Sequence, residues 1–360
     1  MTHVMVIAEA GVNHNGDLDM AKALIDAAAD AGADVVKFQT FNAGLLVTKT
    51  AELAEYQQQA TETASSQYEM LKKLELSDQD HKALIAHCSS RGIAFLSTPF
   101  DHHSLCRLTQ DCSVEQLKIG SGDMTNYPLV LEAARTGLPI IMSCGMATVA
   151  EIEIALGALA YGYTGGDAPN PKAFRQILKD RDAHAILEKK VVLLHCTTAY
   201  PAPYDEISLR AMETLRNHFK IPVGFSDHSE GNSVSVAAAA LGACVIEKHI
   251  TLDRNLPGPD HRASIEPDEL AQLVRDIRIV TTALGTPEKL LTGSEKKNKR
   301  VARKSLHATA VIQVGGIFNA ANLSIKRPET GLSPEHYWRL LGRTATRDYD
   351  VDDPITEDLA

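Results

Sequence analysis

The sequence predicts an α/β fold, a (β/α)8 TIM barrel over residues 1–285 followed by a small β-rich domain. Short apolar runs alternate with amphipathic helical patterns along the first 285 residues. The runs are apolar almost throughout, which is typical of parallel strands that are covered on both faces. The length of 360 residues leaves room for a second domain, because a domain averages roughly 150 residues.

The alternation yields eight expected strands, each followed by a helical stretch. In chain order the strands are residues 3–9, 34–39, 93–98, 116–120, 139–143, 191–195, 222–226 and 244–249. Helical patterns such as 18–33 and 234–243 end near Gly32 and Gly242, since glycine commonly terminates helices. A doubly wound open sheet is the alternative. Its usual GxGxxG signature is absent, because Gly11 and Gly16 lie too far apart for it.

Three segments interrupt the alternation. Residues 41–77 are long and polar and are expected to form a loop or short helix over one barrel face, and residues 161–190 form a second long connection. Such connections are often lids or specificity elements, and a plain surface excursion is an equally good interpretation. Residues 286–301 are predicted to be a linker, with their basic residues on a solvated face.

Residues 302–360 form the predicted second domain, with short β-like pieces and a helix start at Ser333. A domain of this size is marginally stable alone, so we expect it to dock on another surface.

Composition excludes several classes of protein. The 36 Lys and Arg residues against 46 Asp and Glu give a net charge of −10, which argues against nucleic-acid or anionic-membrane partners. The N-terminus lacks a signal-peptide pattern and no apolar run is long enough to span a membrane. The six cysteines are scattered without CxxC spacing, so we expect a reduced, cytoplasmic protein.

Polar residues follow the apolar part of every expected strand, at the barrel face that carries active sites. One group is cationic and hydroxylic, which suits an anion such as a phosphate-carboxylate. It comprises Lys37, Thr98, Lys118, Ser121, Ser143 and Ser226. Gln39 ends the same strand as Lys37 and is a candidate substrate-binding residue.

A second group suits a divalent metal ion. His228 and His249 follow consecutive strands, with the carboxylates Glu9 and Glu247 expected nearby. Asp260, in the loop after the eighth strand, is placed to face the pocket. A Cys–His nucleophile at His195 and Cys196 is not expected, because adjacent strand residues point to opposite faces.

The motifs around these residues resemble the sialic acid synthase family, which includes N-acetylneuraminate, legionaminic and pseudaminic acid synthases. The matching runs are IAEAGVNHNG, VVKFQTF, STPFD, LKIGSGD, HCTTAYPAPY, GFSDHS, EKHITLD and GPDHRASIEPDEL. The later runs VARKSLHATAVI and GGIFNAANLSIKRP resemble that family's SAF (antifreeze-like) domain. The resemblance covers essentially the whole chain.

The resemblance implies a metal-dependent condensation. C3 of phosphoenolpyruvate adds to the aldehyde of an N-acyl hexosamine, water attacks C2, and phosphate leaves with cleavage of the C–O bond. The expected acceptor is N-acetylmannosamine or a close analogue. The alternative is 2,4-diacetamido-2,4,6-trideoxymannose, the acceptor of N,N'-diacetyllegionaminate synthases. The expected ion is Mn²⁺, with Mg²⁺ or Co²⁺ as alternatives.

The resemblance also implies residue roles. The cationic and hydroxylic group would bind phosphoenolpyruvate, His228 and His249 would bind the metal, and Glu9 would act near the metal and the reacting water. Tyr200, Glu247 and Asp260 match sugar-pocket residues. Arg327 matches an arginine that the SAF domain of one subunit delivers to the partner's active site in a homodimer.

Some features depart from the simplest members of the family. Thr198 stands where some sialic acid synthases have Asn, and the connection after the fifth strand is long, which favours the legionaminic branch or an intermediate. Two other classes remain as alternatives. A sugar-binding pseudo-enzyme would be expected to lack some of these residues, and a 3-deoxy-octulosonate phosphate synthase would lack the SAF-like tail.

Overall fold

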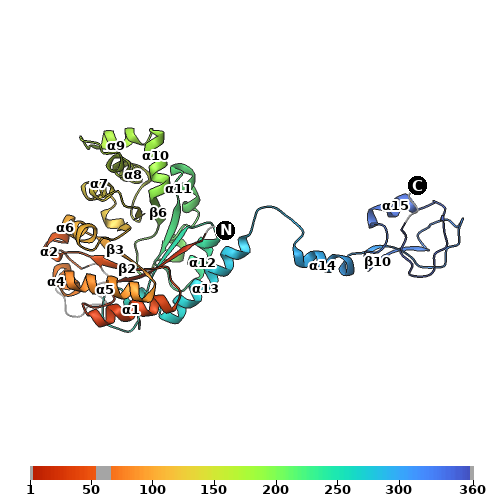
Figure 1. Cartoon of the computed structure of the whole chain (residues 1–360), viewed down its shortest axis with the longest axis horizontal. Coiled ribbons are helices and arrows are strands. Elements are labelled where there is room, and N and C mark those ends of the chain that lie inside the picture. Colours follow the sequence, from red (N-terminus) through yellow and green to blue (C-terminus); the bar gives the residue numbers. More distant parts are fainter. Residues whose placement is uncertain (1–2, 54–65, 357–360) are drawn as a thin grey trace. The chain divides into compact units, whose positions relative to one another are not determined.

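The computed structural model describes residues 3–53 and 66–356, and the chain divides into two compact units, Met1–Gly285 and Thr286–Ala360 (Figure 1). Its helices are α1 (Leu18–Asp30), α2 (Ala43–Leu46), α4 (Gln67–Leu74), α5 (Asp78–Arg91), α6 (His102–Cys106), α7 (Tyr127–Arg135), α8 (Val149–Thr164), α9 (Pro171–Ile177), α10 (Arg181–Lys190), α11 (Ala211–Phe219), α12 (Ser233–Ala240), α13 (Pro267–Leu284), α14 (Gly293–Ala302) and α15 (Tyr337–Leu340). None of the helices in these described ranges is long and apolar enough to cross a membrane.

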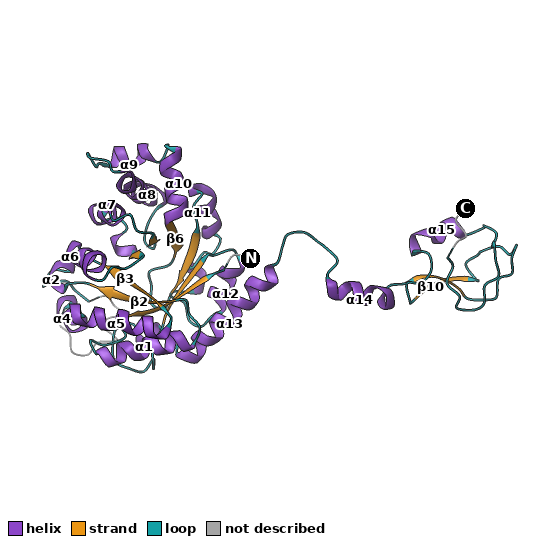
Figure 2. Ribbon diagram, in the orientation of Figure 1, coloured by secondary structure: helices purple, strands orange, loops and turns teal. Residues whose placement is uncertain are grey.

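The first unit is a parallel barrel. Its strands are β1 (Met5–Gly11), β2 (Val35–Thr40), β3 (Ala94–Pro99), β4 (Leu117–Ile119), β5 (Ile140–Ser143), β6 (Val191–His195), β7 (Val223–Asp227) and β8 (Val245–His249). They follow the order β3-β2-β1-β8-β7-β6-β5-β4, and the outer two, β3 and β4, contact each other. Helices surround the strands (Figure 2). The predicted (β/α)8 barrel is therefore confirmed, with strand ends within two residues of those expected.

The barrel has two apolar layers because strand residues alternate between its faces. Residues such as Val6, Ala8 and Val36 belong to the main core with the helices. A separate cluster lies on the opposite face, inside the barrel, and consists of Ile7, Val35, Leu96, Ile141, Leu194 and Val245. This cluster is the apolar floor on which the polar site rests.

Gly224 shows how tightly the barrel interior is filled. A Cβ at this position of β7 would lie 2.5 Å from the Val245 carbonyl oxygen and 2.6 Å from Leu194 Cδ2. Because two floor residues already occupy that space, β7 contributes a glycine at this level.

The expectation of one long connection over residues 161–190 is wrong. These residues complete α8 and then form α9 and α10. The side chain of Asn170 caps α9, which has Pro171 in its first turn, and the side chain of Asp180 caps α10. The Gly- and Pro-rich composition around residues 165–171 hid these two helix starts, although Asn and Asp are favoured caps.

The other long segment contains helices too. Residues 41–77 include α2 and α4, and α4 begins at the cap Ser66. The part of the expected loop at residues 54–65 lies outside the described residues.

The second unit contains an antiparallel pair, β9 (Ser305–Ala308) with β10 (Leu323–Lys326), and the helices α14 and α15. Its own apolar core includes Leu306, Phe318, Leu340 and Tyr349. Residues 293–302, most of the predicted linker, form α14, which starts at a capping box between Thr292 and Glu295.

Candidate active site

The polar site is built by the same alternation that builds the apolar floor. Six floor residues are each followed, two positions later on the same barrel face, by a residue that lines a single cavity. These six lining residues are Glu9, Lys37, Thr98, Ser143, Cys196 and Glu247. Since successive inward residues lie two positions apart, the strands place their polar groups on one level above the floor. The cavity has a volume of about 250 Å³.

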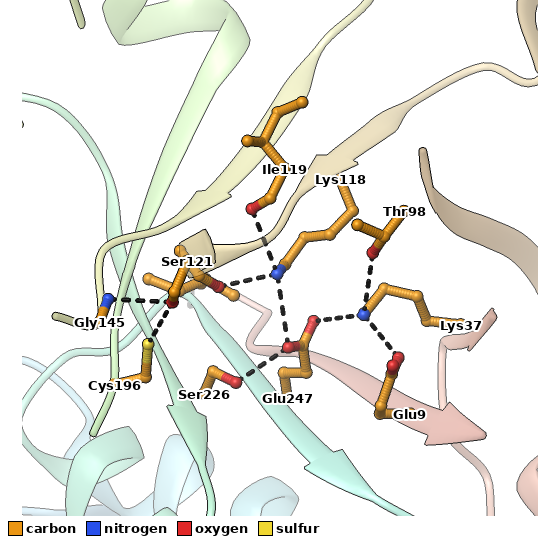
Figure 3. A network of polar contacts seen from close by, with 12 residues as sticks. Glu9, Lys37, Thr98, Lys118, Ile119, Ser121, Gly145, Cys196, Ser226 and Glu247 are labelled. Atoms are coloured by element: carbon orange, nitrogen blue, oxygen red, sulfur yellow. Dashed lines mark hydrogen bonds and ion pairs between the residues drawn. The ribbon is translucent and has the colours of Figure 1, made fainter. Parts of the chain in front are cut away.

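Two lysines and two glutamates form the base of this cavity (Figure 3). Lys37 Nζ lies 2.6 Å from Glu9 Oε2 and 3.7 Å from Glu247 Oε2. Lys118 Nζ lies 3.6 Å from Glu247 Oε1. All four residues are at most 3% exposed. Glu247 thus bridges the two cations, and it lines the same cavity as Glu9 and the two histidines.

Hydroxyl groups complete the contacts of these charges. Lys118 donates to Ser143 Oγ at 2.7 Å, and Lys37 donates to Thr98 Oγ1 at 3.3 Å. Ser226 donates to Glu247 Oε1 at 2.9 Å. Buried charges require such partners, because an uncompensated one is costly to remove from water. The hydroxyls and lysines together present a set of donors to the cavity.

The two glutamates have opposite protonation behaviour. Burial raises the pKa of Glu9 to about 7, and the charge of Glu247 adds to this effect while Lys37 opposes it. Burial also disfavours ionised Glu247, but the nearby lysines outweigh it and lower the pKa of Glu247 to about 2. Below about pH 7, where Glu9 is mostly protonated, two protonated lysines and an ionised Glu247 give the four groups a net charge of one positive. The base therefore favours an anion.

The histidines lie on the β7–β8 side of the same cavity. The ring centroids of His228 and His249 are 5.6 Å apart, and the Tyr200 ring lies 4.3 Å from His228. Burial lowers the pKa of His228 and takes the pKa of His249 well below its usual value, so both imidazoles are neutral at pH 7. Neutral imidazole is the form that binds metal ions.

Each of the two imidazoles has a ring nitrogen that suits a divalent metal ion. His228 Nδ1 lies 2.7 Å from the Thr197 carbonyl oxygen. Donation from Nδ1 to this oxygen leaves the lone pair of Nε2 available to a metal ion. His249 Nδ1 is buried without a hydrogen-bond partner. The two imidazoles therefore fit part of a metal site. Among the described residues, however, no group of three or more His, Cys, Asp or Glu could hold a metal ion.

Asp260 is held over the cavity by the segment that follows β1. Asn15 donates to the Pro257 carbonyl oxygen at 2.9 Å, and Asn13 donates to Ser264 Oγ at 2.8 Å. Ser264 in turn donates to the Asp260 carbonyl oxygen at 2.7 Å. Burial raises the pKa of Asp260 to about 6.

All but one of the residues expected at the site line this one cavity. The exception, Arg327, belongs to the second unit. The lining set contains Glu9, Lys37, Gln39, Thr98, Lys118, Ser121, Ser143, Tyr200, Ser226, His228, Glu247, His249 and Asp260. Gln39 donates to Glu9 Oε1 at 3.3 Å. Arg327 is an exposed residue of the second unit and directly follows β10.

Other polar residues at the strand ends face away from the cavity. Ser97 contacts Thr40, and His195 contacts the Ile207 carbonyl oxygen. Lys248 forms a buried ion pair with Asp227 at 3.0 Å. Their positions alternate with those of the lining residues, so strand periodicity explains why they lie behind the site.

Sequence reasoning missed several lining residues. Cys196 lies 3.2 Å from Ser121 Oγ, and burial raises the pKa of its thiol, so it is a neutral neighbour of the anion-binding group. Its place two positions after the floor residue Leu194 was the available signal. Five apolar lining residues were also missed: Val12, Met70, Leu71, Leu74 and Phe100.

The comparison with protein families agrees with this geometry. Residues 24–289 match the NeuB family. The chain belongs to the NeuB family. The resemblance expected from the sequence motifs is thereby confirmed for the family, over residues 24–289.

Relatives of this NeuB family member extend over nearly its whole length. It is 45% identical over 357 residues to N,N'-diacetyllegionaminic acid synthase of Campylobacter jejuni, covering 99% of this chain and 100% of that one. It is 43% identical over 337 residues to the protein of the same name from Legionella pneumophila, covering 94% and 89%. It is 34% identical over 356 residues to human N-acetylneuraminate-9-phosphate synthase, covering 98% and 92%.

A solved structure is also similar to this NeuB family member. The N-acetylneuraminic acid synthetase of Leptospira borgpetersenii, in complex with citrate, has a TM-score of 0.66 and 34% identity, covering 82% of this chain and 90% of that one.

The raised pKa of Glu9 predicts a pH-dependent stability. Folded Glu9 holds its proton up to about pH 7, whereas the unfolded residue loses it near 4.5, so protons favour the folded state between these values. The free energy of unfolding of the wild type relative to Glu9→Gln should therefore fall as pH rises from about 4.5 to about 7, and then level off. Urea denaturation of the full chain in metal-free buffer at several pH values measures this difference.

The variant Glu213→Gln, which removes an exposed carboxylate from α11, is the control for general charge effects. Unfolding curves of the wild type and Glu9→Gln that stay parallel across this pH range would contradict the assignment.

Proposed function

We propose that the protein condenses phosphoenolpyruvate with 2,4-diacetamido-2,4,6-trideoxymannose and water to give N,N'-diacetyllegionaminic acid and phosphate. The base of the cavity carries this proposal, because the pair Lys37 and Lys118 with its hydroxyl donors suits a small substrate that has both a phosphate and a carboxylate. The two relatives named N,N'-diacetyllegionaminic acid synthase support this sugar over N-acetylmannosamine.

N-acetylmannosamine is the second candidate acceptor. Its support is the Leptospira N-acetylneuraminic acid synthetase, which is similar to this chain at lower identity than the two legionaminic acid synthases. We therefore rank it below the diacetamido sugar.

Different residues of the cavity bind the two substrates. Lys37, Lys118, Thr98, Ser143, Ser121 and Ser226 hold the phosphoenolpyruvate anion, and donors fixed beforehand avoid reorganisation in the transition state. Tyr200 and Asp260 line the part of the cavity that would receive the hexosamine. C3 of phosphoenolpyruvate bonds to the aldehyde carbon, water bonds to C2, and the C2–O bond to phosphate breaks.

Glu9 is the proposed proton carrier. Its pKa of about 7 allows it to accept a proton from the attacking water or to donate one to the aldehyde oxygen. Gln39, which donates to Glu9 Oε1, orients the carboxyl group.

A divalent metal is part of the proposal, with His228 and His249 as its protein ligands. A bound ion would supply Lewis-acid polarisation of the aldehyde oxygen. Mn²⁺ is our first choice, and Mg²⁺ or Co²⁺ are alternatives. Of the residues that the structure describes, these two imidazoles are the ones that would hold the ion, and oxygen atoms of the acceptor and of water would complete its ligand set.

The second unit has its own proposed role. We assign residues 302–360 as an SAF (antifreeze-like) domain, preceded by the segment 286–301, and residues 1–285 as the synthase domain. In a homodimer, the SAF domain would deliver Arg327 to the partner's cavity, where its guanidinium would bind the acidic substrates. The six cysteines are free, in line with a cytoplasmic enzyme.

A substrate panel tests the proposed reaction. We expect kcat/KM with phosphoenolpyruvate to be at least tenfold higher for 2,4-diacetamido-2,4,6-trideoxymannose than for N-acetylmannosamine or the altrose analogue, in line with discrimination of about 10- to 200-fold by small apolar groups. The assay is run after chelation and after return of Mn²⁺, Mg²⁺ or Co²⁺. A preference for N-acetylmannosamine would overturn the sugar assignment, and no turnover of any acceptor would overturn the reaction.

Subunit complementation tests the role of Arg327. We expect Arg327→Ala and Lys118→Ala each to lose activity, because each removes a cation from every site. If dimers form at random from an equal mixture, half are hybrids with one intact site, so about a quarter of the wild-type activity should return. Hybrid dimers that form without regaining activity would contradict delivery of Arg327 between subunits.

A further inference from the structure

One side of the cavity mouth is apolar. Val12, Met70, Leu71, Leu74 and Phe100, which we call the apolar wall, line the same cavity as the charged base. None of these side chains carries an N–H or O–H group, and only the weak thioether acceptor of Met70 is polar. A ligand group that lies against these side chains therefore receives no hydrogen bond from them.

The apolar wall is a packed structure rather than scattered surface residues. Val12, Met70 and Leu74 are buried and form an apolar cluster with Phe41, apart from the main core, and Leu71 and Phe100 pack against it. The rings of Phe41 and Phe100 meet edge to face, with centroids 6.2 Å apart. Because α4 supplies three of the five residues, its docking on Phe41 fixes the shape of the wall.

On β1 and β3, the residues of the apolar wall come later in the sequence than the residues of the charged base. Val12 comes three residues after Glu9, and Phe100 comes two residues after Thr98. Along β1 and β3, therefore, the polar groups of the base come first and the wall residues follow at the strand ends. A substrate anion on the base would leave the wall for the second substrate.

The other side of the cavity mouth, after β6 and β8, is lined by polar residues. The wall follows β1, β2 and β3, which are neighbours in the barrel, whereas Thr198, Tyr200 and Asp260 follow β6 and β8. The acceptor thus meets hydroxyl and carboxyl groups on one side and hydrocarbon on the other.

We propose that the apolar wall selects acceptor sugars by their methyl groups, favouring a 6-deoxy, di-N-acetylated hexosamine over one with a C6 hydroxyl. This inference rests on the proposed function and specifies how the site reads the sugar. The diacetamido-trideoxy sugar has a methyl group at C6 and two acetyl methyl groups. A methyl group gains by leaving water for this wall, whereas a C6 hydroxyl placed there would lose its hydrogen bonds to water without replacement.

The test exchanges one wall residue and compares two sugars that differ only at C6. Leu71 is half-buried, and glutamine is a good helix former, so Leu71→Gln should fold and offers an amide to a hydroxyl. The acceptors are 2,4-diacetamido-2,4,6-trideoxymannose and its 6-hydroxy analogue. We expect the ratio of their kcat/KM values, 6-deoxy over 6-hydroxy, to fall about tenfold in Leu71→Gln, with KM for phosphoenolpyruvate unchanged.

Two variants serve as controls. Leu45→Gln makes the same exchange at an exposed leucine of α2 that is not part of the wall, and it should keep the wild-type ratio. Leu71→Met keeps an apolar side chain and should also keep it. An unchanged ratio in Leu71→Gln, or an equal change in Leu45→Gln, would overturn the role of the wall. Failure of the wild type to use the 6-deoxy sugar would instead contradict the proposed function.

Discussion

Two buried lysines at the base of the cavity are the constraint on which the rest of the site depends. Lys37 and Lys118 are nearly inaccessible to solvent, and an isolated charge in such a place would cost far more than a typical protein's whole stability. Glu247 lies between them and Ser143 and Thr98 accept from them, so the cations persist without a ligand. Because the pKa of Glu9 is about 7, Glu9 can be neutral, and the cluster can then bind an anion.

Around these lysines the cavity has three regions. The charged base suits an anionic substrate, the two neutral imidazoles on the β7–β8 side suit a Lewis acid, and the apolar wall on the β1–β3 side suits methyl groups of an acceptor. Each region comes from a different set of strand ends, as is common in barrels of this kind. One cavity thereby brings three chemical environments within reach of two substrates.

The sequence was sufficient for the barrel and for most of the cavity lining, because strand periodicity is written directly in the order of apolar and polar residues. The pattern is seen where an apolar floor residue is followed two positions later by a polar lining residue, as in Ile7 and Glu9 or Val245 and Glu247. The ion pairs of these carboxylates with Lys37 and Lys118 were not predictable, since they depend on which strands are neighbours and how far each side chain reaches. The apolar wall was missed because α4 is distant in sequence from Val12 and Phe100. The helices α9 and α10 were missed because turn-forming residues surround their caps.

The central claim is that the base of the cavity binds an anion beside a titrating Glu9. Calorimetric titration of phosphoenolpyruvate into the enzyme near pH 7.5, in buffers with different ionisation enthalpies, measures the protons exchanged on binding. A substrate anion close to Glu9 should raise the pKa of that carboxyl further, so the wild type should take up more protons than Glu9→Gln. Equal proton exchange in the two proteins would contradict the account.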